Sequence, residues 1–143
     1  MMPARENTIL IADDFSIFRR FIHSTLKENG FQNVAEASDG VEAVAKAAHL
    51  HPDLVLLDIR MPNLDGIKAA AQIRTRSPKA KILFLSIFTD PDIVQLAVSE
   101  GAAGYVPKSE MHRELLPAIE AALEGGGVRG RTIAAPYAIG RLE

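Results

Sequence analysis

The chain has 143 residues, no cysteine and a formal net charge of −2. Its length is typical of one domain with a buried core, and the lack of cysteine excludes disulfides, thiolate catalysis and Cys-based metal sites. The charge gives no basic field that would attract nucleic acid. Neither a signal-like apolar core at the N-terminus nor a membrane-length apolar run is present, so we expect a cytoplasmic protein without membrane contact.

Short apolar segments alternate along the chain with segments whose apolar residues recur at helical spacing. The apolar segments predict strands at residues 8–12, 31–38, 54–57, 81–86 and 104–108. The intervening segments predict five helices, at about residues 15–29, 39–49, 66–77, 91–100 and 115–124. Such alternation is typical of an α/β fold with a parallel sheet, helices on both faces and right-handed crossovers.

Local signals mark several helix ends. Asp39 with Glu42 three residues later indicates a capping box, and the Pro after His51 ends the second helix. Pro117 is harmless only if the fifth helix starts late, and otherwise it kinks the first turns. The chain becomes glycine-rich at its end, so we expect residues 125–143 to form a linker-like or disordered tail.

Polar residues stand at the carboxyl ends of four predicted strands. Asp13 and Asp14 follow the first strand, Asp58 follows the third, Ser86 ends the fourth and Lys108 ends the fifth. Because the carboxyl ends of parallel strands share one edge of a sheet, we expect these side chains to converge on one crevice. Taken singly, each has an ordinary structural explanation as a cap, a turn residue or a solvated side chain.

The combination indicates phosphoryl-transfer chemistry. Three neighbouring carboxylates repel one another unless a cation joins them, and a hard divalent ion such as Mg²⁺ meets that need. Lys108 supplies a compact positive charge for a phosphate oxygen, and Ser86 can donate a hydrogen bond to the same group. Asp58 is then a plausible nucleophile, because carboxylates form aspartyl-phosphates and the surrounding charges would stabilise the transferring group.

On these motifs, residues 8–124 resemble the receiver domain of two-component response regulators. The resemblance is carried by Asp13-Asp14, by the run Asp-x-x-Met-Pro-x-x-Asp-Gly at residues 58–66, and by Ser86 and Lys108. It implies a flavodoxin-like (βα)₅ fold, which is a doubly wound five-stranded parallel sheet in the order 2-1-3-4-5.

The resemblance also implies a role for each site residue. Asp58 is similar to the phosphoacceptor, and Tyr105 to the aromatic switch residue. The implied ligands of Mg²⁺ or Mn²⁺ are Asp13, Asp14, Asp58 and the main-chain carbonyl of Arg60. The implied phosphate-sensing pair is Ser86 and Lys108.

The implied function is that of a phosphorylation-activated switch and not of an enzyme, since it acts only on its own aspartyl phosphate. A sensor histidine kinase or a phosphotransfer protein would donate the phosphoryl group. Ser86 would move toward the phosphate, Tyr105 would rotate inward, and the face formed by the fourth helix, fifth strand and fifth helix would be repacked for a partner. Phosphorylation-dependent pairing of two copies is a second expectation.

Residues 86–127 look most like receivers joined to a helix-turn-helix DNA-binding domain. We therefore expect the input domain of a transcription regulator, with a stand-alone receiver in a phosphorelay as the alternative; this domain itself should bind no nucleic acid. Two of the departures from the family pattern concern the site. Ser109 stands where many receivers have Pro, and Ile87 stands where many have a small residue that leaves the phosphorylated Asp accessible. Arg60 and Phe88, each two residues past a key position, would tune the rate at which the phosphorylated Asp turns over.

Three other classes of protein share part of this pattern. A haloacid-dehalogenase-like phosphatase needs a second Asp two residues after the nucleophile, where this chain has Arg60. A flavin- or nucleotide-binding module needs a Gly- or Ser/Thr-rich loop after the first strand, where Asp13-Asp14 would repel phosphate. A receiver-like interaction domain that takes no phosphate would not need the complete acidic set.

Overall fold

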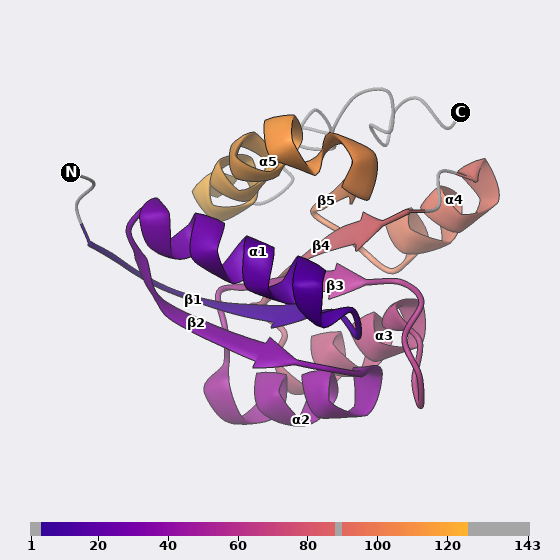
Figure 1. Ribbon diagram of the computed structural model, residues 1–143. Helices are drawn as coiled ribbons and strands as arrows, with labels where there is room; N and C mark the ends of the chain where they lie inside the picture. The colour runs from indigo at the N-terminus through magenta and orange to yellow at the C-terminus, as the bar shows by residue number, and fades with distance from the viewer. Residues whose placement is uncertain (1–3, 88–89, 126–143) are drawn as a thin grey trace.

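The computed structural model describes residues 4–87 and 90–125, which form one parallel sheet between two layers of helices (Figure 1). Its strands are β1 (Arg5–Ala12), β2 (Phe31–Ala37), β3 (Leu54–Asp58), β4 (Lys81–Ser86) and β5 (Gly104–Pro107). Its helices are α1 (Ser16–Glu28), α2 (Gly40–Leu50), α3 (Gly66–Arg76), α4 (Pro91–Ser99) and α5 (Met111–Gly125), with a 3₁₀ turn, η1 (Lys108–Glu110), before α5. The strand order β2-β1-β3-β4-β5 confirms the predicted doubly wound, flavodoxin-like α/β fold.

The two faces of the sheet carry separate apolar cores. On one face α1 and α5 pack against strand side chains that include Leu54 and Leu56, and on the other face α2, α3 and α4 pack against Val55 and Leu57 (Figure 1). All four of these β3 side chains are 0% exposed. The unbroken apolar run of β3 is therefore explained by burial on both faces, as predicted.

The start of β1 and the end of β5 are two of the strand boundaries that differ from the prediction. β1 begins at Arg5 rather than Thr8, because the Arg5 N–H donates to the carbonyl of Gly30 (N···O 2.8 Å) and extends the pairing with β2. β5 ends at Pro107, and Lys108 already belongs to η1. Polar residues at one boundary and a change of backbone geometry at the other hide both from a search for apolar runs.

The helix ends follow the predicted signals, with one exception. His51 ends α2 in the left-handed conformation (φ 49°), directly before the Pro that stops the helix. The exception is Pro117, because α5 starts at Met111 and so encloses it. Of the two alternatives, the late helix start does not occur, and α5 lacks one main-chain hydrogen bond where the Pro117 N–H is missing.

The end of the chain is described only in part. Gly125, the first residue of the predicted tail, is the last residue of α5. The rest of that predicted tail, residues 126–143, and the rate-tuning position Phe88 lie outside the described residues. Among the helices of the described part, none is both long and apolar enough to span a membrane.

Candidate functional site at the carboxyl edge of the sheet

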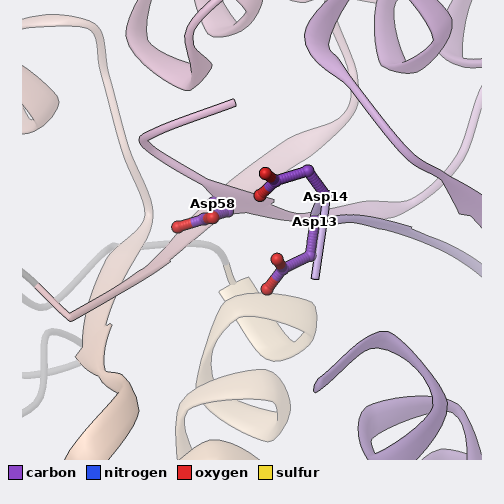
Figure 2. Close-up of side chains that lie close together, drawn as sticks. All are labelled: Asp13, Asp14 and Asp58. Carbon is purple, nitrogen blue, oxygen red and sulfur yellow. The ribbon is translucent and has the colours of Figure 1, made fainter. Parts of the chain in front are cut away.

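The ends of β1 and β3 bring the predicted carboxylates together. Ala12 and Leu57 are register partners, so the residues that follow them, Asp13 and Asp58, lie side by side. One carboxylate oxygen from each of Asp13, Asp14 and Asp58 lies within 4.8 Å of the other two. Figure 2 shows the three carboxyl groups projecting beyond the strand ends. Asp13 is 1% and Asp58 is 7% exposed, whereas Asp14 is exposed to solvent.

Asp13 is held in place through its side chain and its main chain. Its Oδ1 accepts a hydrogen bond from the Phe15 N–H (2.9 Å), and its carbonyl accepts one from Arg19 Nη1 (2.7 Å). Arg19 is itself fixed, because its Nε donates to Glu36 Oε1 at the end of β2 (2.8 Å). Burial acts to raise the pKa of Glu36, but hydrogen bonds from His23 and Arg19 outweigh it and hold the pKa below its ordinary value. This charged network therefore ties the Asp13 loop to α1 and β2.

The loop after Asp58 packs closely on the strand that it leaves. The Ile59 N–H donates to Asp58 Oδ1 (2.9 Å), and the Gly66 N–H returns to the Ile59 carbonyl (2.6 Å). A Cβ on Gly66 would lie 2.0 Å from the main-chain oxygen of Asp58, so only glycine fits there. Asn63, at a positive φ of 71°, donates through Nδ2 to the α2 cap residue Asp39 (2.7 Å). The loop thus fixes the direction of the Asp58 side chain.

Lys108 enters the same cluster from η1. Its Nζ lies 2.6 Å from Asp13 Oδ2 and 3.5 Å from Asp58 Oδ2. It also lies 4.4 Å from the centroid of the Phe18 ring. The Lys108 side chain is only 6% exposed, so its ammonium is almost entirely removed from solvent. The sequence-based prediction that Lys108 joins the acidic edge is therefore met geometrically.

The negative charges at this edge outnumber the positive charge that Lys108 brings. Burial raises the pKa of Asp58 to about 7, the charge of Asp13 adds to that rise, and the ammonium of Lys108 opposes it. Asp13 Oδ2 accepts no hydrogen bond from the described residues, so its contact with Lys108 is an ion pair without directed hydrogen-bond geometry. Buried, charged oxygen donors of this kind suit a hard divalent cation.

The remaining predicted residues lie at this edge or close to it. Ser86, the last residue of β4, is 0% exposed and stands one position beyond the register partner of Asp58. Arg60, two residues after the end of β3, is exposed, and Ile87 is 67% exposed. Tyr105 is 0% exposed and belongs to the core that also contains residues of α4.

Two residues of the site were missed by the sequence reasoning. Neither Phe18 nor Arg19 was among the predicted site residues. In the structure Phe18 contacts the Lys108 ammonium, and Arg19 bonds the main chain of Asp13. The available signal was position, because both residues lie in the first turn of the helix that directly follows Asp13-Asp14.

The fold and the site define an α/β protein with an acidic cluster and a buried lysine at the carboxyl edge of its sheet. A family model, the response regulator receiver domain, matches residues 9–120. The chain therefore belongs to the response regulator receiver domain family of two-component signalling.

Curated relatives fall into two groups. The chain is 39% identical over 114 residues to the chemotaxis protein CheY of Listeria monocytogenes, covering 80% of this chain and 96% of the relative. It is 41% identical over 115 residues to the transcriptional regulatory protein PdtaR of Mycobacterium tuberculosis, covering 80% of this chain and 56% of the relative. A probable transcriptional regulatory protein NarL of the same species is 35% identical over 136 residues, covering 94% of this chain and 60% of the relative. The chain thus spans little more than half of either transcription regulator.

Solved structures show the same fold. The signal receiver domain of the putative response regulator NarL from Mycobacterium tuberculosis superposes with a TM-score of 0.79 at 31% identity, covering 85% of this chain and 98% of that one. A two-component response regulator of the LuxR family from an Aurantimonas species gives a TM-score of 0.84 at 32% identity, covering 96% of both chains.

Proposed function

We propose that this receiver domain is a phosphorylation-activated switch in which Asp58 accepts a phosphoryl group from a sensor histidine kinase or a phosphotransfer protein. The observation that carries the proposal is the setting of Asp58. It is a buried carboxylate whose Oδ2 lies 3.5 Å from the Lys108 ammonium, next to the carboxylates of Asp13 and Asp14. A nucleophile beside a fixed cation suits phosphoryl transfer, because that reaction requires the charge of the phosphoryl oxygens to be stabilised.

In the proposed reaction a carboxylate oxygen of Asp58 attacks the phosphorus atom of the donor. A bond forms between Asp58 Oδ2 and phosphorus, and the bond from phosphorus to the donor's histidine nitrogen breaks, leaving its electron pair on the imidazole. Oδ2 is the oxygen that we assign, because Oδ1 accepts the hydrogen bond from the Ile59 N–H (2.9 Å) and is held by it. Lys108 Nζ, 3.5 Å from Oδ2, is placed to bind a phosphoryl oxygen.

The acidic cluster is proposed to hold Mg²⁺ or Mn²⁺. The ligands would be the carboxylates of Asp13, Asp14 and Asp58 and the main-chain carbonyl of Arg60. The carboxylates fit such an ion, because their oxygens lie within 4.8 Å of one another and Asp13 Oδ2 accepts no hydrogen bond from the described residues. When bound, the ion would neutralise charge on the carboxylates and on the phosphoryl group.

The switch itself is proposed to act through Ser86 and Tyr105. Phosphorylation adds about −1 charge at Asp58, compared with roughly −1.5 to −2 on a neutral hydroxyl. A hydrogen bond from Ser86 to the phosphoryl group would stabilise the arrangement in which the Tyr105 ring lies inside, and the α4-β5-α5 face would be repacked around it. Full conversion needs roughly 5 kcal/mol, which a few charge-assisted hydrogen bonds at about 1.5–3 kcal/mol each can supply.

The proposed output is control of transcription through a linked DNA-binding domain. The similarity to the NarL relative supports it, because that similarity runs over 136 residues and 94% of this chain. The CheY match, which covers 96% of that relative, favours a stand-alone receiver as the second candidate. In either case the domain would act only on its own aspartyl phosphate. A haloacid-dehalogenase-like phosphatase needs an Asp as general acid at the position where this chain has Arg60.

Incubation with acetyl phosphate and Mg²⁺, followed by intact-protein mass measurement, tests the proposal. We expect one phosphoryl group on the wild type and none on Asp58→Asn. The matched control is Asp53→Asn, which removes a carboxylate at the opposite end of β3, where it accepts the Thr8 N–H (2.7 Å). Equal phosphorylation of Asp58→Asn and wild type would show the assignment of Asp58 to be wrong.

The same samples test the proposed pairing of phosphorylated copies. Sedimentation velocity should show a rise in mass for the phosphorylated wild type and none for Asp58→Asn. An unchanged mass of the phosphorylated wild type would remove phosphorylation-driven dimerisation while leaving the assignment of Asp58 intact.

A further inference from the structure

We propose that Phe18 is a positioning residue for Lys108, whose ring holds the lysine ammonium over Asp13 and Asp58 in the place where it meets the phosphoryl group. The inference rests on the proposed phosphorylation of Asp58. It adds a residue of α1 to a reaction that otherwise depends on residues at the strand ends.

The geometry around the ammonium carries the inference. Lys108 Nζ lies 4.4 Å from the centroid of the Phe18 ring, within the range in which a cation is attracted to an aromatic face. The same atom lies 2.6 Å from Asp13 Oδ2 and 3.5 Å from Asp58 Oδ2. Because the lysine side chain is only 6% exposed, little water competes for the ammonium, and the attraction to the ring is stronger than at a surface.

An aromatic ring suits a cation that must change partners. The attraction of the ammonium to the Phe18 face takes up no carboxylate or hydroxyl acceptor, so all three N–H groups of Lys108 stay available for oxygen atoms. When a phosphoryl oxygen arrives at Asp58, Nζ can turn toward it without breaking a hydrogen bond to Phe18. A further acidic side chain in place of the ring would instead compete with the phosphoryl group for the ammonium.

The Phe18 ring is itself supported and closes off part of the lysine. It packs edge-on against Phe15, with ring centroids 5.3 Å apart and an interplanar angle of 62°. A groove of about 300 Å³, lined by both α1 and the start of α5, lies beside it. Phe18, Phe21 and Lys108 are among its lining residues. Loss of the Phe18 ring would therefore open the ammonium to water from this groove.

The test compares three variants of the whole chain. Phe18→Leu keeps an apolar side chain but removes the aromatic face, and Phe18→Tyr keeps the face. Phe21→Leu is the matched control, because Phe21 lies on the same helix, lines the same groove and is 48% exposed. If Phe18→Leu does not fold, Phe18→Met serves in its place, since Met fills irregular apolar space.

The first measurement needs neither metal nor phosphate. In the NMR spectrum of the metal-free protein, the side-chain methylene protons next to Lys108 Nζ should be shifted to low frequency by the Phe18 ring, with Lys108→Arg used for assignment. We expect that shift in the wild type, in Phe18→Tyr and in Phe21→Leu, and its loss in Phe18→Leu. A wild-type spectrum without the shift would overturn the inference.

The second measurement is the rate constant of phosphorylation by saturating acetyl phosphate with Mg²⁺. Phe18→Leu should be about threefold to tenfold slower than the wild type, while Phe18→Tyr and Phe21→Leu should lie within about twofold of it. A purely structural role would instead lower the melting temperature without separating Tyr from Leu in rate. Equal rates of Phe18→Leu and wild type, or a Phe18→Tyr as slow as Phe18→Leu, would overturn this inference alone. A wild type that takes no phosphate would remove the proposed function and this inference with it.

Discussion

Two cation–carboxylate pairs stand at opposite ends of the sheet and are built from the same kinds of parts. At the start of β1, Arg5 forms a two-pronged pair with Glu120 of α5, with distances of 2.6 and 2.8 Å, and its guanidinium lies 4.2 Å from the ring centroid of Phe31. At the carboxyl edge, Lys108 lies 2.6 Å from Asp13 Oδ2 and 4.4 Å from the ring centroid of Phe18. Each cation thus has a carboxylate and a phenyl ring.

The balance of charge separates the two ends. Arg5 faces one carboxylate, and its hydrogen bonds lower the pKa of Glu120 against the effect of burial. Lys108 faces Asp13 and Asp58, with Asp14 nearby, and the pKa of Asp58 is raised to about 7 by burial and then by Asp13. The first pair braces α5 against β1, and the second leaves an excess of negative charge that a cation can relieve. Surplus carboxylates, and not the type of contact, therefore distinguish the carboxyl edge from the opposite end.

The largest change in stability is expected at Gly66, where the carboxyl edge depends on close backbone packing rather than on charge. Gly66→Ala should lower the free energy of unfolding by about 3 kcal/mol or more, because its Cβ would lie 2.0 Å from the main-chain oxygen of Asp58. Gly101→Ala is the control, since its positive φ of 79° carries strain while its nearest contact, at 3.1 Å, is the side chain of Arg74; it should cost about 1 kcal/mol. Urea denaturation of both variants provides the measurement. Equal losses of free energy of unfolding would show that the loop between β3 and α3 shifts to accommodate the added Cβ.

Removal of one carboxylate should change the free energy of unfolding in opposite directions at the two ends of the sheet. Asp58→Asn should raise the free energy of unfolding by about 1–3 kcal/mol at pH 8 in the presence of EDTA, because it removes a buried charge that is repelled by Asp13. Mg²⁺ should then stabilise the wild type more than the variant, since a ligand of the native state stabilises in proportion to its binding. A loss of stability in Asp58→Asn would mean that the positive charge of Lys108 already compensates the negative charge of the acidic cluster.

The pair of Arg5 and Glu120 at the amino end should behave in the opposite way, because loss of either charge should lower the free energy of unfolding. Arg5→Gln and Glu120→Gln should each destabilise the domain, with a coupling energy of about 1 kcal/mol in a double-mutant cycle. That value is kept small because the side chains are 24% and 43% exposed, which allows solvent to screen the pair. Mg²⁺ affinity, measured by calorimetry, should not change. A changed Mg²⁺ affinity would show that the pair at the amino end is energetically coupled to the acidic cluster at the carboxyl edge.

The sequence predicted the arrangement of elements far better than the contacts within the site. Alternation of apolar runs with helical patterns is sufficient for a parallel sheet with helices on both faces, and the resemblance to receiver domains supplied the strand order. Strand ends are sufficient to bring Asp13, Asp58 and Lys108 to one edge. Helical spacing shows which side of α1 is buried but not that the Phe18 ring meets an ammonium, because such a contact depends on side-chain conformation across the fold. The position of the Tyr105 ring is likewise a choice between rotamers of one residue, which a sequence pattern does not encode.

The smallest expected effect shows that a place at the carboxyl edge does not by itself raise a pKa. Glu42, near the start of α2, accepts a hydrogen bond from the Ser38 N–H (2.7 Å). That bond, followed by the one from Lys46, lowers the pKa of Glu42 from 4.5 to about 2. A lowered pKa contributes stability that is fully present above about pH 4.5 and is lost as the pH falls toward 2.

Glu42→Gln keeps an oxygen acceptor but removes the charge, so at neutral pH it should cost about 0.5 kcal/mol, a value reduced because the side chain is 38% exposed. The difference from wild type in urea denaturation should shrink between pH 4.5 and pH 2, and Lys68→Gln, a substitution on the exposed surface of α3, should show no such trend. A difference that stays constant with pH would assign the effect to side-chain shape. A difference that shrinks would show that hydrogen bonding lowers the pKa of one carboxylate at this edge. At Asp58, by contrast, burial and the charge of Asp13 outweigh the hydrogen bond from the Ile59 N–H and keep the pKa raised.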